Sequence, residues 1–285
     1  MTIRKLALLP LLSCVLAGPV RAADPPAVGM VVDVQGGVQV IEQGRKAPLQ
    51  LLARLAPGTR LELPPQSHAS VTLYGNRSVY RLTGPATADV TRDDIKVVQG
   101  KPPEVKAMGE RQVASAPTGA MVAGAYRMRT IQLVTPMVLA SPENGSVLLD
   151  TRPTFVWEGA ADARFNVVIQ QLGGGPSYRA TVSGNRWALP EGTRLSHGAG
   201  YVWSVTADSA AEPTTATGRF SLATQVEVDQ FTALLPAETD PIEDWVYYAA
   251  LLQQRQVRTE ARQAWQRIAR ERPDLQRAAE LARQP

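Results

Sequence analysis

Cysteine and histidine are almost absent from this sequence, and their scarcity narrows the chemistry that we expect. The one cysteine, Cys14, cannot form a disulfide within the chain, so the folded domains must be stabilised by packing alone. The two histidines, His68 and His197, lie far apart, and neither has a second potential ligand at the spacing of a metal site. We therefore expect no metal centre, no cofactor and no catalytic residue based on histidine or cysteine.

The sequence also lacks a clear excess of charge of one sign. The whole chain has 30 Lys and Arg against 26 Asp and Glu, a net charge of +4. Arg4, Lys5 and Arg21 belong to an N-terminal segment that we expect to be removed, which leaves 27 basic and 26 acidic residues. Nucleic-acid-binding proteins usually carry a clustered basic face, so this balance argues against a nucleic-acid partner.

Long hydrophobic runs are missing except at the N-terminus. An apolar run over residues 6–17 follows Arg4 and Lys5, which is the pattern of a secretory signal peptide. The run is too short to span a bilayer, and no later stretch approaches the ~20 apolar residues that a transmembrane helix needs. We predict that residues 1–22 are a signal peptide cleaved between Ala22 and Ala23, and that the protein is periplasmic.

A second interpretation of the N-terminus involves its cysteine. Residues 11–14, Leu-Leu-Ser-Cys, resemble a lipobox, the signal at which bacterial lipoproteins are cut and lipidated. The apolar run continues past Cys14. Removal of the whole segment is therefore the main prediction, and lipidation at Cys14 is left as the alternative.

Residues 24–100 predict a small all-β domain. Apolar residues alternate with polar ones, and turn residues interrupt the pattern every eight to twelve positions. We expect strands at residues 30–34 and 38–41, followed by a hairpin over residues 69–85 that turns at Gly75.

Within that hairpin, Val71, Leu73, Val79 and Leu82 are expected to face the domain core. The hairpin is then a scaffold, and the adjacent carboxylate pair Asp93 and Asp94 is expected to lie in a solvated turn.

The spacing of strands and turns in this domain resembles the FecR domain. The residues that carry the resemblance are Gly29, Val31, Val34, Gly36, Val38, Val40, Gly58, Leu61, Ser70, Val71, Leu73, Gly75, Ser78, Leu82 and Thr87. The chain departs from the family at Pro64 and Pro65 and in its hairpin turn, where the family often has Gly-Asp and Asp-Gly-Ser. The resemblance implies envelope signalling, in which a periplasmic domain senses or relays the state of a membrane-bound partner.

Residues 101–135 have charges, proline and glycine without a period, which is typical of a linker. Residues 136–224 then show about seven short strands with large aromatics, and they resemble an immunoglobulin-like or fibronectin type III-like sandwich. The spacing of Leu195, Tyr201 and Trp203 is similar to that of a tyrosine corner. A domain of the antibody type is excluded because it needs a cysteine pair.

Residues 225–285 change to helical spacing. The positions of Trp245, Tyr248, Ala249, Leu252, Ala261, Trp265, Ile268 and Pro273 resemble one tetratricopeptide repeat. A single repeat cannot bury its own apolar face, so it needs a neighbour. We predict that Tyr247, Leu251 and Val257 face this neighbour, which is either the sandwich of the same chain or a partner molecule.

Together these features predict a mainly β protein with a FecR-like domain, an immunoglobulin-like β-sandwich and a C-terminal α-helical hairpin. The expected function is non-enzymatic binding or scaffolding in the periplasm, with an envelope or inner-membrane protein, or a second copy, as partner. One alternative is a cell-wall or glycan-binding module, which would need an exposed row of aromatics such as Trp157, Trp187 and Trp203. Another is an enzyme whose site is assembled across domains.

The signal-peptide prediction is tested by N-terminal sequencing of the protein purified from the envelope. We expect the mature chain to begin at Ala23, because the small residue at position 22 suits signal peptidase. A chain that begins with a lipidated Cys14 would instead support the lipobox interpretation.

Overall fold

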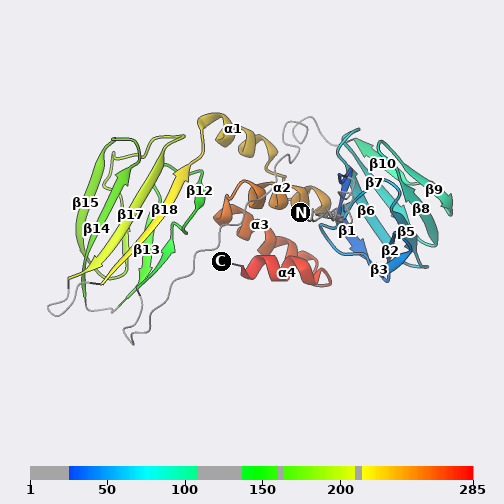
Figure 1. The fold of residues 1–285 in the computed structure, drawn as a ribbon, viewed down its shortest axis with the longest axis horizontal. Helices are drawn as coiled ribbons and strands as arrows, with labels where there is room; N and C mark the ends of the chain where they lie inside the picture. The colour runs from blue at the N-terminus through cyan, green and yellow to red at the C-terminus, as the bar shows by residue number, and fades with distance from the viewer. Residues whose placement is uncertain (1–25, 108–136, 160–162, 209–213, 285) are drawn as a thin grey trace, which may run out of the picture.

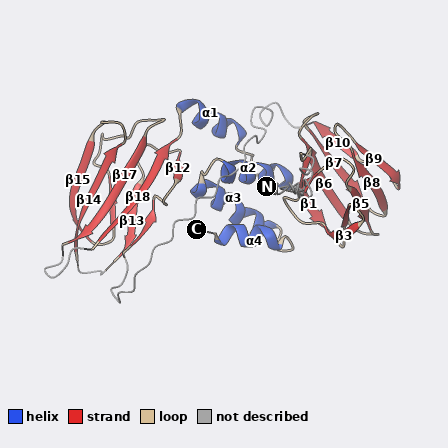
Figure 2. Ribbon diagram, viewed as in Figure 1, coloured by secondary structure: helices blue, strands red, loops and turns tan. Residues whose placement is uncertain are grey.

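The computed structural model describes residues 26–107, 137–159, 163–208 and 214–284. It contains two β domains with a group of four helices between them (Figures 1 and 2). The prediction of a mainly β chain with a C-terminal helical region is therefore confirmed. No helix within the described ranges has the length and apolar character needed to cross a membrane.

The first domain consists of two antiparallel five-stranded sheets. We call β10-β7-β6-β1-β4 the inner sheet, because it faces the helices, and β3-β2-β5-β8-β9 the outer sheet. The strands are β1 Gly29–Gln35, β2 Gln39–Glu42, β3 Arg45–Pro48, β4 Arg54–Leu55, β5 Arg60–Leu63, β6 His68–Leu73, β7 Ser78–Thr83, β8 Ala86–Val90, β9 Ile95–Gln99 and β10 Glu104–Ala107.

The core of this domain lies between the two sheets, where alternate residues of each strand point inward. Leu61 and Leu63 of β5 meet Val71 and Leu73 of β6 in this cluster. The intervening residues of β6, Ser70 and Thr72, are also buried, because the helices cover the other face of the inner sheet. The central strands β1 and β6 of the inner sheet are thus buried on both sides.

The hairpin of β6 and β7 is a scaffold element, with one correction to the prediction. Val71, Leu73 and Leu82 lie in the core between the sheets. Val79 packs on the helical side instead. Because side chains alternate along a strand, residues 79 and 82 of β7 cannot share a face.

The predicted linker also contains a strand. Glu104–Ala107 forms β10, which pairs with β7 at the edge of the inner sheet. All four residues are exposed, so the strand has no alternation of apolar and polar residues by which it could have been predicted. The rest of the predicted linker, residues 108–135, lies outside the described residues.

The second domain is a sandwich of a three-stranded and a five-stranded sheet. The strands are β11 Val138–Ser141, β12 Ser146–Leu148, β13 Thr154–Glu158, β14 Arg164–Gln171, β15 Ser177–Ser183, β16 Arg186–Ala188, β17 Gly200–Ala207 and β18 Thr215–Leu222. Their orders are β11-β13-β16 and β12-β18-β17-β14-β15, with β12 parallel to β18. This division of strands is that of an immunoglobulin or fibronectin type III sandwich, as predicted.

Aromatic side chains fill the interior of the sandwich. Phe155 lies 5.1 Å from Trp203 and 5.9 Å from Phe220, measured between ring centroids. The tyrosine corner is present, because the Ser196 backbone N–H donates to the Tyr201 hydroxyl at 2.8 Å. This bond fixes the corner that leads into β17.

Four helices follow the sandwich: α1 Gln225–Leu234, α2 Ile242–Gln254, α3 Arg258–Glu271 and α4 Gln276–Arg283. The sequence analysis did not predict α1, although Thr224 and Glu227 form a capping box at its start. Helix α2 begins one residue later than predicted, and Pro241 rather than Asp240 is its N-cap. Ala249 and Ala261 are buried in the helical core, which allows close packing of α2 and α3.

Replacement of Leu73 by aspartate should unfold the first domain. The side chain is completely buried, so the substitution loses a burial worth about 1.5–3 kcal/mol and adds the cost of a buried carboxyl group. Thermal unfolding followed by circular dichroism measures the effect. Val98→Asp is the control, since Val98 is 63% exposed on β9. An unchanged transition in Leu73→Asp would contradict the described packing.

Candidate functional site

The most extensive contact between distant parts of the chain joins the inner sheet to the helices. Met30 and Val32 of β1, together with Leu51, belong to the same apolar cluster as the buried residues of α2, α3 and α4. Val31, between them, points into the core of the first domain. Strand β1 therefore connects two cores.

A buried carboxylate lies at one end of this contact. Asp33 of β1 is only 3% exposed and accepts a hydrogen bond from Arg272 at 2.7 Å. Arg272, just after α3, also donates to the Val34 carbonyl at 3.3 Å and to Asp274 at 2.8 Å. The second carboxylate oxygen of Asp33 lies 2.9 Å from Nε2 of His68. Asp33 is thus held by one side chain of its own domain and one from the helices.

A second buried carboxylate lies on α2. Glu243 is 6% exposed, forms an ion pair with Arg81 of β7 and accepts a hydrogen bond from the Ser70 hydroxyl at 3.1 Å. Nearby, Lys106 of β10 lies 3.8 Å from Asp244. Both ends of the interface therefore pair an acidic side chain with a basic one across the two domains.

The arginines in these pairs lower the pKa of the carboxyl groups that they contact. Burial alone would raise the pKa of Glu243, but the hydrogen bonds and charge of Arg81 and the Ser70 hydroxyl outweigh it, and the pKa lies below its usual value. The hydrogen bond from Arg272 lowers the pKa of Asp274 in the same way. Both carboxylates are therefore charged at neutral pH and act as fixed acceptors.

The Asp33–His68 contact gives His68 a carboxylate neighbour within the first domain. The two residues lie on the paired strands β1 and β6, so sequence spacing could not reveal their proximity. Arg272 already neutralises Asp33, which makes the group an ion pair of the interface rather than a general base. Across the described residues, no three His, Cys, Asp or Glu side chains are grouped as metal ligands would be.

The helices also contact the sandwich. Glu143 forms ion pairs with Arg258, at 3.6 Å, and with Arg262 of α3. The Val147 backbone N–H donates to the Gln256 carbonyl at 2.9 Å, which attaches β12 to the turn before α3. The helices therefore dock within the chain, on both β domains.

The predicted partner-facing residues are buried by this docking. Tyr247, Leu251 and Val257 are 7%, 4% and 0% exposed. Leu251 and Val257 lie in the helical cluster, and burial raises the pKa of Tyr247, which lies close to Tyr74 of the first domain. The prediction left open whether the sandwich or a partner molecule covers these side chains, and the structure buries them within the chain, among the helices and against the first domain.

The other residues singled out in the sequence have ordinary surroundings. His197 is exposed, and its Nδ1 lies 3.0 Å from the Ala223 carbonyl oxygen. Trp157 and Trp203 are buried, and Trp187 packs 5.6 Å from Phe155, so these three form no exposed row. The predicted lipidation and cleavage residues Cys14, Ala22 and Ala23 lie outside the described residues.

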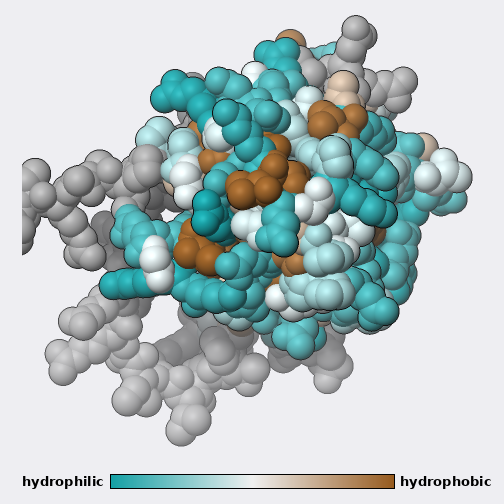
Figure 3. All heavy atoms as spheres, turned by 90° about the vertical axis from the view of Figure 1, so that its right-hand side faces the viewer, coloured by the Kyte–Doolittle hydropathy of each residue, from teal (hydrophilic) through white to brown (hydrophobic). Residues whose placement is uncertain are grey.

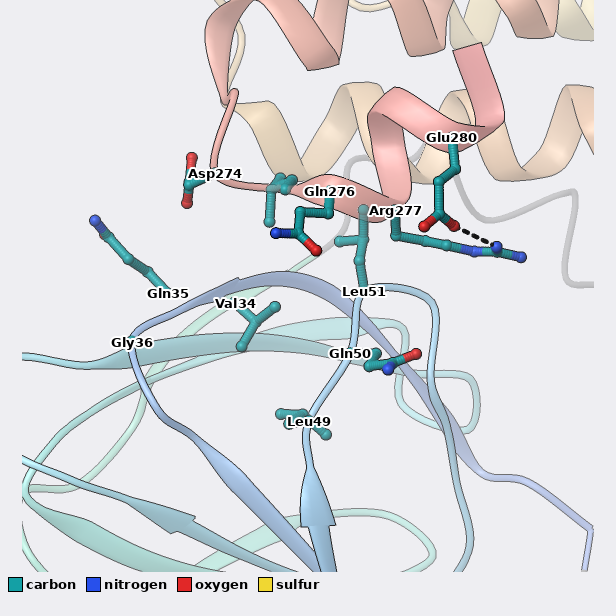
Figure 4. A pocket seen from close by; sticks show the side chains of 11 residues that line it. Val34, Gln35, Gly36, Leu49, Gln50, Leu51, Asp274, Gln276, Arg277 and Glu280 are labelled. Atoms are coloured by element: carbon teal, nitrogen blue, oxygen red, sulfur yellow. Dashed lines mark hydrogen bonds and ion pairs between the residues drawn. The ribbon is translucent and has the colours of Figure 1, made fainter. Parts of the chain in front are cut away.

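A cleft of about 380 Å³ opens beside the Asp33 group, between the first domain and α4 (Figure 4). Val34, Leu49 and Leu51 line it from the β domain. Gln276 and Arg277 line the helical side, and Arg277 is paired with Glu280 at 2.8 Å. The cleft is a seam between these two parts of the chain, and Asp274, which also lines it, is paired with Arg272.

Comparisons with known proteins bear on the sandwich alone. No family model and no curated protein matches the chain. The fibronectin type III domain of the human collagen alpha-1(XX) chain is similar, with 18% identity over 41% of this chain and 96% of that one, at a TM-score of 0.26. A two-domain fibronectin type III segment of chicken tenascin has 13% identity over 70% of this chain and 95% of that one, at a TM-score of 0.22. The sandwich assignment itself rests on the strand order and the tyrosine corner described above.

The Glu243–Arg81 pair predicts a pH-dependent stability. The pKa of Glu243 is lowered in the folded state, so its contribution is complete above the unfolded value near 4.3 and is lost as the pH falls through the folded value. Glu243→Gln should lower the free energy of unfolding by about 1–2 kcal/mol at pH 7, because Arg81 is half exposed and the pair is only partly shielded from water.

Urea unfolding at pH 7 and at pH 3 measures this difference. It should shrink at the lower pH, because pH 3 lies below the ordinary pKa of a glutamate, and the unfolded wild-type chain takes up a proton that the folded pair resists. Glu280→Gln is the matched control, since it removes an exposed pair with Arg277 and should change stability little at either pH. A Glu243→Gln protein as stable as the wild type at pH 7 would contradict the role of this pair.

Proposed function

We propose that this protein is a non-enzymatic binding or scaffold protein of the bacterial periplasm. In this proposal the first domain is a FecR-type domain, and α2 and α3 form a tetratricopeptide-like unit. The residues of the FecR pattern have structural roles that support the proposal. Val31, Leu73 and Leu82 are core residues, while Gly36 and Gly58 have φ values of +81° and +89°, which favour glycine.

The pairing of the carboxylates supports a function without catalysis. Asp33, Glu143 and Glu243 each pair with an arginine from another part of the chain. Such carboxylates maintain an interface, whereas a general acid or base needs an ionisable group that faces a substrate.

The observation that carries the proposal is that the helices cover only one of the two faces of the first domain. The helices cover the central strands of the inner sheet, so we expect a partner of the first domain to bind the outer sheet. Figure 3 views the molecule from that end, and it shows separate apolar patches among hydrophilic side chains. A mixed surface of this kind is typical of non-obligate protein contacts.

The outer sheet presents ordered polar groups to such a partner. Arg60 donates two hydrogen bonds to Asp89, at 2.7 and 2.9 Å, and Lys46 pairs with Glu62. Exposed pairs of this type contribute little to stability, so their fixed geometry is available for recognition. Clefts of about 500 and 450 Å³ lie on two sides of the sheet, and Val98 protrudes from β9.

Site-specific photocrosslinking in the native envelope tests this proposal. A photoreactive amino acid at Val98 should capture one envelope or inner-membrane protein, because that side chain is exposed on the outer sheet. The matched control is Val226 on α1, which is 65% exposed but distant from the outer sheet, and it should capture nothing specific.

Arg60→Ala should reduce the crosslink at Val98 without changing the thermal transition, since the Arg60–Asp89 pair is exposed. Equal capture from Val98 and Val226, or no capture from Val98, would contradict a partner on the outer sheet.

A further inference from the structure

The sandwich has one long strand edge that lacks the usual protection against pairing. Strand β15 bonds only to β14 within the described residues, and it does so over seven consecutive residue pairs without a register shift. Its residues alternate between exposed and half-buried along its whole length. Figure 1 places β15 at the end of the molecule farthest from the first domain.

The other sheet edges are protected in recognisable ways. Strand β3 has two basic residues and a proline, β10 has two charged residues, and the pairings of β9 and β11 each contain a register shift. Strand β12 is attached to the helices, and β4 and β16 have only two and three residues. Natural proteins use such devices to prevent edge-to-edge association. Strand β15 has seven residues, no proline and a single charge, Arg179.

The backbone groups that face the open edge follow from the hairpin between β14 and β15. The Gln171 N–H donates to the Pro176 carbonyl at 3.2 Å, which makes this pair hydrogen-bonded. Bonded and non-bonded pairs alternate along an antiparallel ladder, so Tyr178, Ala180 and Val182 bond to β14. The N–H and C=O groups of the intervening residues, Ser177, Arg179, Thr181 and Ser183, therefore point outward.

We propose that β15 pairs with β15 of a second copy of this chain, antiparallel about a two-fold axis at Ala180. In this register Arg179 lies opposite the partner's Thr181, and Ser177 lies opposite the partner's Ser183. All four residues whose backbone N–H and C=O groups point outward then lie opposite another such residue on the second strand, and no two like charges lie opposite each other. Tyr178 and Val182 come together on one face of the joined sheet.

The neighbouring registers are less favourable. An axis at Arg179 would place two arginines opposite each other. An axis at Thr181 would leave Ser177 without a partner residue on the second strand. The strand thus complements itself best in one register, which favours a second copy over an unrelated extended segment. A two-fold contact also closes on itself, so it gives a dimer and not a fibre. This surface is distant from the outer sheet and does not depend on the proposed function.

Charge substitutions at Thr181 test the register in the full mature chain, with the dissociation constant measured by sedimentation equilibrium. Thr181→Glu places a carboxylate opposite the partner's Arg179 twice in each dimer, so dimerisation should tighten by roughly 2- to 30-fold. Thr181→Lys places like charges there and should weaken it by a similar factor. Thr181→Gln is the neutral control, which like the others loses the Thr181 hydroxyl bond to Asn166.

Thr181→Pro removes an outward N–H and should abolish the dimer, while the thermal transition of the monomer persists because proline is tolerated at a free edge. Three outcomes would overturn the proposal: a wild-type chain and a Thr181→Glu variant that are both monomeric, a Thr181→Glu change that weakens dimerisation, or a dimer that survives Thr181→Pro. If the wild type is monomeric and Thr181→Pro instead abolishes capture of another protein, the occupant of the edge is that protein's extended segment and not a second copy.

Discussion

The structure depends on the burial of strand β1 on both of its faces. Val31 belongs to the core of the first domain, while Met30 and Val32 belong to the core of the helices. A strand with apolar side chains on both faces would expose one of them to water unless a second layer covered it. The C-terminal helices are that layer, and the Asp33–Arg272 and Glu243–Arg81 pairs determine how they sit. Apolar burial supplies the attraction, and the charge pairs supply the orientation.

Local features of the fold were predictable because their signals are local. Alternating valines and leucines identified the β6–β7 hairpin, and the spacing of Leu195 and Tyr201 identified the tyrosine corner. The docking of the helices on the first domain was not predicted, because only the sandwich or a partner molecule was expected as their neighbour. The sequence contains one indication of it, the three consecutive apolar residues Met30, Val31 and Val32. A strand with one face in water alternates apolar and polar residues, whereas consecutive apolar residues indicate a strand buried on both faces. The partners of Asp33 and Glu243 could not be inferred, because they come from other strands or from the opposite end of the chain.

The position of the helices in the structure shows which surfaces cover their apolar side chains. The spacing of the helical residues predicted a neighbour for Tyr247, Leu251 and Val257, either the sandwich or a partner molecule, and the chain itself supplies that neighbour. The helices contact the first domain through α2 and the turn after α3, and they contact the sandwich through Glu143 and Gln256. The two surfaces proposed for other molecules, the outer sheet and β15, lie at opposite ends of the molecule (Figure 1).

The burial of β1 on both faces also has a consequence during synthesis, because the residues that cover one face lie far along the sequence. Met30 is synthesised more than 200 residues before Glu243 and Arg272, the side chains that anchor its cover. At roughly 5–20 residues per second, about 10–40 s pass between the synthesis of Met30 and the synthesis of the residues that cover it. Throughout that interval an apolar strip of the nascent protein is open to solvent, and export of an unfolded precursor would postpone its closure further. The segment that covers the apolar face of β1 is therefore made long after the strand itself.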